Sequence, residues 1–271
     1  MTHKLPNQSV QDWLTWIKQK TCQTGNLAAQ DDLGVPIIIE WKRTDILSPD
    51  LAEFKKCICE MASQNLAPLE IAFLRAYPDA VSQEMFLQPC APLFEKGLNF
   101  VDWQAVEEKI KSTIKQFYLM DLSSFGTEVI KPLLNDVYFY ATIRNLNSQQ
   151  LLGFIMFAIT PALEFGHIKI IHIALAPEQQ NRGLEKRLTG AIFRIVPSST
   201  RLFLYVRPTN DHAIRQYCDW GFIQEFPFTQ DPNHPINTDY LIRLEYRTEK
   251  SDSLQKTAMD FEDLQLQRMN Q

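Results

Sequence analysis

The chain has 271 residues, of which 45% are hydrophobic and 22% charged, and its formal net charge is −5. This composition is typical of a folded protein with a sizeable core and excludes an intrinsically disordered chain. The mild acidity and the lack of any Arg/Lys block argue against nucleic acid as a partner. No apolar run approaches the ~20 residues of a membrane-spanning helix, so we expect no membrane partner either.

The cysteines indicate a reducing environment. They are odd in number and unevenly spaced, and no histidine or cysteine set accompanies them at metal-ligand spacing. They stand at Cys22, Cys57, Cys59, Cys90 and Cys218. The first nine residues are polar, and no apolar signal-peptide core follows them. We therefore expect free thiols, no bound metal and a cytoplasmic location.

Residues 1–65 have the pattern of an N-terminal extension of helix, strand and helix. An amphipathic helix is expected at 10–20, a strand at 36–41 and a second helix over 48–63. The proline-containing stretch 65–68 predicts a break between this extension and the main domain. A second organisation is also open, in which the strand and the following helix already start the main domain.

Residues 66–248 predict a mixed α/β sheet flanked by helices rather than a doubly wound sheet. The expected strands are 69–74, 137–144, 151–160, 167–176, 202–206, 222–226 and 240–246, and the expected helices are 102–118, 127–135, 183–195 and 211–220. The strand at 167–176 is apolar on both alternating faces, which is typical of a central strand covered on both sides. Gly153 is placed to mark a bulge, and residues 249–271 predict a mobile polar tail with a weak helical pattern.

One candidate binding segment is IHIALAPEQQNRGLE at residues 171–185, which predicts a buried strand, a glycine turn and a helix start. A helix N-terminus offers free N–H groups and a positive dipole end to phosphate oxygens, and glycine allows close approach of the backbone. Arg182, Lys186 and Arg187 add positive charge. The turn at 180–185 is therefore a candidate pyrophosphate site, although an ordinary strand-to-helix turn can have the same composition.

A second segment lies downstream, where Asn210, Ala213 and Tyr217 share one helix face by their spacing. Alone, this pattern is also that of a surface helix with an N-cap asparagine and a core tyrosine. A buried strand precedes it, however, and a glycine follows it. With the first segment upstream, the two stretches resemble the acyl-CoA-binding motifs of the GNAT N-acetyltransferase superfamily.

The resemblance covers about residues 66–248 and implies the GNAT fold, acetyl-CoA as acyl donor and a primary amine as acceptor. In such proteins the central strand pairs with the pantetheine arm, the turn amides hold the pyrophosphate, and a tyrosine near the sulfur protonates the leaving thiolate. Carried over by position, the cofactor-binding residues are Ile173, Leu175, Gln180, Asn181, Arg182, Gly183, Leu184, Glu185, Asn210 and Tyr217, and Tyr217 is also the expected catalytic acid.

The group that deprotonates the amine is less defined by the sequence. The candidates are His172 on the central strand, Glu164 just before it, and Glu70. His172 also fits a hydrogen-bonded core histidine, and the superfamily often uses a bound water instead. Small amines, protein N-termini and lysines all remain open as acceptors, and no pattern indicates the oligomeric state.

Glu185 departs from the superfamily motif, which has glycine or alanine at this position. A carboxylate there suits the helix dipole but repels a pyrophosphate. The side chain either turns to solvent, which preserves binding, or folds back into the anion site. Two functions therefore stay open, an active N-acetyltransferase and a scaffold with an impaired CoA site. A third, an aminoacyl transferase on the same fold, is disfavoured because the pyrophosphate turn is kept.

Overall fold

The computed structural model describes residues 25–43, 51–84, 87–124, 137–159, 167–195, 201–224, 241–246, 253–260 and 262–263. Its centre is a nine-stranded sheet in the order β7-β8-β6-β5-β4-β3-β2-β1-β9. The strands are β1 (Gly25–Gln30), β2 (Pro36–Arg43), β3 (Val137–Asn145), β4 (Leu151–Ile159), β5 (His167–Leu175), β6 (Arg201–Val206), β7 (Phe222–Gln224), β8 (Ile242–Tyr246) and β9 (Glu262–Asp263). Among the described strands, only β5 and β6 pair in parallel, so the predicted mixed sheet is confirmed.

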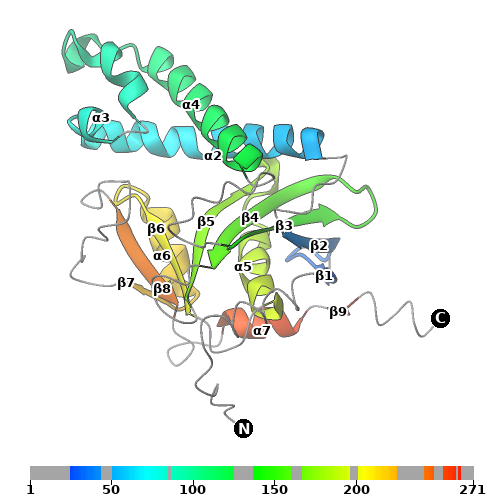
Figure 1. The fold of residues 1–271 in the computed structure, drawn as a ribbon. Coiled ribbons are helices and arrows are strands. Elements are labelled where there is room, and N and C mark those ends of the chain that lie inside the picture. The colour runs from blue at the N-terminus through cyan, green and yellow to red at the C-terminus, as the bar shows by residue number, and fades with distance from the viewer. Residues whose placement is uncertain are drawn as a thin grey trace.

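Helices cover both faces of this sheet (Figure 1). One face carries α2 (Leu51–Ala76) and α4 (Trp103–Ser124), which also pack on each other. The other face carries α5 (Leu184–Ile195), α6 (Asp211–Asp219) and α7 (Ser253–Met259). The short elements α3 (Ala80–Gln83), η1 (Gln88–Phe94), η2 (Leu98–Phe100) and η3 (Pro177–Gln179) complete the described helices. Each face of the sheet therefore has its own hydrophobic core.

The central strand β5 is covered on both faces as predicted, but its side chains do not alternate throughout. Ile170 pairs with Phe157 and His172 pairs with Met156, so Ile171 is an extra residue in the ladder. This bulge shifts the alternation by one residue. Ile173 and Leu175 consequently share the α5 face with Ile168 and Ile170, and the predicted division of the strand into two regular faces is wrong. The register also shifts opposite Gly153, which confirms the bulge predicted there.

Residues 69–74 are not a strand, because α2 runs without interruption from Leu51 to Ala76 with Pro68 inside it. Its buried residues, among them Ala67, Ile71 and Leu74, recur at helical spacing and pack in the α2–α4 core. This burial outweighs the cost of an interior proline. The boundary expected at residue 66 falls inside this helix, and β2 pairs with β3. That pairing favours the organisation in which the strand at 36–41 already starts the domain.

The C-terminal segment, predicted as a mobile tail, contains α7. Leu254 of this helix is fully buried, and α7 packs on α5 at Gly190. A Cβ at Gly190 would lie 3.1 Å from Thr257 Cγ2, so the glycine permits the close approach of the two helices. The helices expected at 10–20 and 127–135 lie outside the described residues.

Candidate active site

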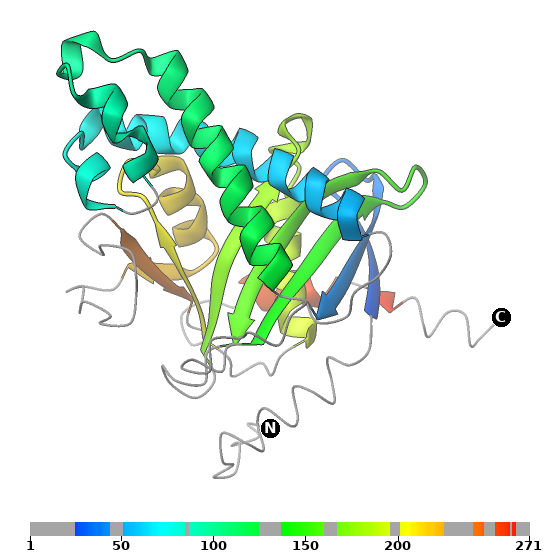
Figure 2. The same cartoon turned by 45° about the horizontal axis from the view of Figure 1, so that its top comes forward.

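The parallel strands β5 and β6 separate after three residue pairs. Their register runs from His167↔Arg201 to Lys169↔Phe203, after which the strands diverge (Figures 1 and 2). The Ala176 N–H donates to the Leu152 carbonyl at 2.9 Å. The backbone N–H and C=O groups of successive residues in a strand point to opposite sides. Those of Leu175 and Ile173 therefore point away from β4, toward the side where β6 diverges from β5. We call this divergence of β5 and β6 the splay. These backbone groups form a strand edge that can pair with amide groups of a ligand.

The predicted pyrophosphate turn lies at the open end of the splay, between η3 and α5. Asn181 and Gly183 have φ values of 62° and 69°, a conformation that favours glycine and asparagine. A Cβ at Gly183 would also lie 2.2 Å from Asp32 Oδ2, so only glycine fits without movement of that carboxylate. Leu184 starts α5, whose first N–H groups have no acceptor within the helix. The backbone can therefore hold an anion here.

Two aspartates from the β1–β2 turn hold this segment, and the sequence analysis did not find them. The Arg182 guanidinium donates to the carboxylate of Asp31, whose side chain is fully buried, and to Gln179 Oε1. Arg187 lies 3.4 Å from Asp32 Oδ1. Both arginines expected to attract a pyrophosphate are thus already paired with carboxylates. No local pattern shows this, because Asp31 and Arg182 are 151 positions apart.

Helix α2 supplies a second contact that the sequence did not indicate. Asn65 Nδ2 donates to the Leu175 carbonyl at 2.7 Å, and Asn65 Oδ1 accepts from Gln180 Nε2 at 3.2 Å. One side chain therefore joins the free edge of β5 to the first residue of the turn.

Glu185 takes neither of the two expected positions. Its carboxylate accepts from Gln216 Nε2 of α6 at 2.8 Å, beside Tyr217. Tyr217 is 8% exposed and packs edge-on against Trp220. Burial raises the pKa of the Tyr217 phenol, and the Glu185 charge raises it further. The phenol is consequently held protonated, next to the residue that departs from the motif.

The start of α6 is fixed by a cap and by an ionic cluster. Asn210 Oδ1 accepts from the Ala213 N–H at 3.2 Å, as predicted for an N-cap. Arg207 forms bidentate pairs with Glu70 of α2, at 2.9 and 3.1 Å, and with Glu84 after α3, at 2.5 and 2.6 Å. Glu70, the third candidate base, therefore holds an arginine. Glu164, the candidate just before β5, lies outside the described residues.

Comparison with known protein families finds one family model that matches part of the chain. The family model described as acetyltransferase (GNAT) family matches residues 108–222, a range that includes the splay, the turn, Asn210 and Tyr217. Residues 108–222 are therefore similar to the GNAT acetyltransferase family. No curated protein matches the chain.

Solved structures of acetyltransferases align with the chain at low identity. PaiA N-acetyltransferase from Thermoplasma acidophilum in complex with coenzyme A has 15% identity and a TM-score of 0.36, over 77% of this chain and 98% of that one. A GNAT-family protein from Desulfovibrio desulfuricans has 15% identity and a TM-score of 0.38, over 77% and 96%. A SpeG spermidine N-acetyltransferase mutant from Vibrio cholerae has 18% identity and a TM-score of 0.35, over 53% and 78%.

His172, a candidate base, is neutral at physiological pH. Burial, with a contribution from the Lys169 charge, lowers its pKa to about 3. An imidazole with this pKa is a weak acceptor for an amine proton. The lowered pKa therefore makes His172 a weak general base.

The same shift predicts an acid-dependent loss of stability. Below pH ~6.5 the unfolded chain protonates His172 and the folded chain does not, so the unfolding free energy should fall by up to about 1.4 kcal/mol per pH unit. Urea unfolding between pH 7.5 and pH 4.5 measures this slope, and His172→Gln should have a shallower one. Parallel slopes for the two proteins would contradict the shifted pKa, since their other histidines are identical.

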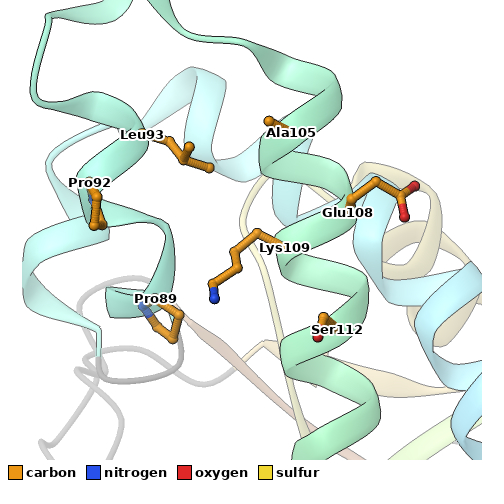
Figure 3. Close-up of a pocket in the computed structure, with 7 residues that line it drawn as sticks. All are labelled: Pro89, Pro92, Leu93, Ala105, Glu108, Lys109 and Ser112. Atoms are coloured by element: carbon orange, nitrogen blue, oxygen red, sulfur yellow. The ribbon is translucent and has the colours of Figure 1, made fainter.

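A shallow groove elsewhere on the molecule belongs to the helical layer. It lies between η1 and α4, has a volume of about 560 Å³, and is lined by residues such as Pro89, Leu93 and Lys109 (Figure 3). None of its lining residues belongs to the predicted CoA site. Within the described ranges no group of histidine, cysteine and acidic side chains could hold a metal ion. Nor is any helix in these ranges long and apolar enough to cross a membrane.

Proposed function

We propose that the chain is an N-acetyltransferase that transfers an acetyl group from acetyl-CoA to a primary amine. The observation that carries the proposal is the splay between β5 and β6, which opens beside the glycine turn before α5. The splay leaves backbone groups of β5 without pairing to β6 beyond Lys169, and the turn places free N–H groups at its open end. Pantetheine amides and a pyrophosphate are chemically suited to these two features.

The proposal gives each part of acetyl-CoA a binding partner among the described residues. The backbone of Ile173 and Leu175 would pair with the pantetheine arm, because it faces the splay. The amides of residues 181–185 would hold the pyrophosphate at the start of α5. Asn210 would contact the arm from the start of α6.

We also propose a cytoplasmic location, which the free thiols of the described cysteines fit.

The transfer forms a C–N bond to the amine and breaks the C–S bond of the thioester. The amine must lose a proton, and His172, with a pKa of about 3, is a weak acceptor. Glu70 is bound to Arg207. Of the described candidates, neither is suited to this step, so we assign it to water, and Glu164, which lies outside the described residues, stays the alternative. The leaving thiolate gains a proton, for which Tyr217 is the proposed donor, since its phenol is protonated at neutral pH; its raised pKa makes it a weak acid. A thiolate of pKa ~8.5 leaves readily, so the gain from this acid is modest.

The chemistry is tested by the release of CoA thiol with a panel of primary amines, including polyamines, N-terminal peptides and lysine peptides. Tyr217→Phe should lower kcat by roughly tenfold with little change in the KM for acetyl-CoA, since the hydroxyl acts on the leaving group. Tyr77→Phe is the matched control, because Tyr77 is 40% exposed and lies outside the site. An unchanged kcat in Tyr217→Phe would remove the tyrosine from the mechanism.

The pairing of the two arginines supports a second candidate function, a GNAT-fold scaffold with an impaired CoA site. Arg182 and Arg187 are bound to Asp31 and Asp32, and Glu185 adds a negative charge at the start of α5. The scaffold candidate expects no acetyl-CoA binding by the unmodified chain and its recovery in Glu185→Ala.

A further inference from the structure

The side chain of Asn65 occupies the free edge of β5. Its Nδ2 donates to the Leu175 carbonyl at 2.7 Å and to the Met61 carbonyl at 2.8 Å. Its Oδ1 accepts from Gln180 Nε2 at 3.2 Å. Both ends of this carboxamide are thus bonded, and they link α2, β5 and the pyrophosphate turn.

The Leu175 carbonyl, which accepts from Asn65, belongs to the edge of β5 that we propose pairs with pantetheine. Leu175 faces the splay, and β6 pairs with β5 only as far as Lys169. A carboxamide carries the same N–H donor and C=O acceptor as the amides of a pantetheine arm. Asn65 therefore satisfies a strand-edge carbonyl, and it does so with the chemical group that a pantetheine ligand would bring.

We propose that Asn65 is a placeholder for a pantetheine amide, and that acyl-CoA displaces it from the Leu175 carbonyl on binding. This inference rests on the proposed function. Asn65 consequently weakens acyl-CoA binding, because one protein hydrogen bond must break before the ligand makes its own.

Calorimetric titration of CoA into the unmodified protein and into Asn65→Ala tests this directly. The variant should bind CoA about three- to tenfold more tightly, which corresponds to one net hydrogen bond that no longer has to break. Adenosine 3′-phosphate 5′-diphosphate, which lacks pantetheine, should bind both proteins equally. Gln64→Ala is the matched control, since Gln64 is exposed on the same helix and its side chain donates to Glu60 of that helix.

The outcomes separate the placeholder from the proposed function. CoA binding that is unchanged or weaker in Asn65→Ala overturns the placeholder and leaves the function intact. Equal tightening of CoA and of the nucleotide also overturns it, because the effect would then act on the turn through Gln180. A lack of CoA binding by both proteins would mean that the proposed function itself fails. Asn65→Ser, whose side chain is too short to reach Leu175, replaces the alanine variant if that one does not fold.

Discussion

Replacing Arg207 with methionine should lower the free energy of unfolding by about 3–5 kcal/mol, because two buried carboxylates lose their only cation in the cluster. The side chains of Arg207, Glu70 and Glu84 are 10%, 13% and 2% exposed. Arg207 also stacks on the Phe73 ring, with its guanidinium carbon 4.1 Å from the ring centroid. The cluster joins the α2–α3 layer to the start of α6, so its loss should loosen that junction. Urea unfolding at pH 7.5 measures the effect.

Acidification should partly rescue Arg207→Met. Burial already raises the pKa of Glu70, and removal of the arginine takes away the opposing charge. A carboxyl group whose folded pKa lies above its unfolded value destabilises the fold at high pH, and this penalty shrinks as pH falls. The deficit relative to the unmodified protein should therefore be smaller at pH 5 than at pH 7.5. Arg215→Met, on the exposed side of α6, is the control with little expected change. An equal deficit at both pH values would show that lost packing, not charge, causes the effect.

Asp31→Ala should destabilise the protein by about 2–4 kcal/mol, because this carboxylate has both a structural and an ionic role. Its Oδ1 accepts from the N–H groups of Leu33 and Val35 at 2.9 and 2.8 Å, which closes the β1–β2 turn. Its Oδ2 accepts from Arg182, whose side chain is 17% exposed. The alanine variant leaves two amides and a largely buried guanidinium without this acceptor. Urea unfolding and amide exchange at Leu33 and Val35 report the change.

Two further variants divide this effect into its parts. Asp31→Asn keeps an oxygen for the two turn amides and loses only the ion pair, so its cost should be about half that of alanine. Asp32→Ala removes the neighbouring, exposed aspartate, whose pair with Arg187 spans 3.4 Å, and should cost less than about 1 kcal/mol. Equal losses for Asp31→Ala and Asp32→Ala would refute the role given to the buried carboxylate.

The parts of the site that could be predicted from sequence are those encoded locally. The strand, turn and helix at 171–185 are one continuous segment, and glycine at a positive φ marks the turn. The N-cap of α6 is also local, since Asn210 caps Ala213 three residues later. Such features depend on neighbouring residues, so periodicity and capping rules find them.

The parts that sequence missed depend on distant pairs or on competing local signals. Asn65 meets Leu175 across 110 positions and Asp31 meets Arg182 across 151, and no periodic pattern carries such contacts. The apolar run at 69–74 fits a strand or a buried helix equally, and Pro68 favoured the wrong choice. The bulge at Ile171 is set by pairing with β4, so strict alternation failed there.

The most direct test of the account is isothermal titration of acetyl-CoA into the unmodified protein, with Glu185→Ala beside it. We expect micromolar binding that changes little in the variant, because the Glu185 carboxylate is held by Gln216 of α6. No binding at millimolar acetyl-CoA by the unmodified protein, with recovery in Glu185→Ala, would contradict the proposal. That result would show that Glu185 closes the site and that this fold serves another purpose.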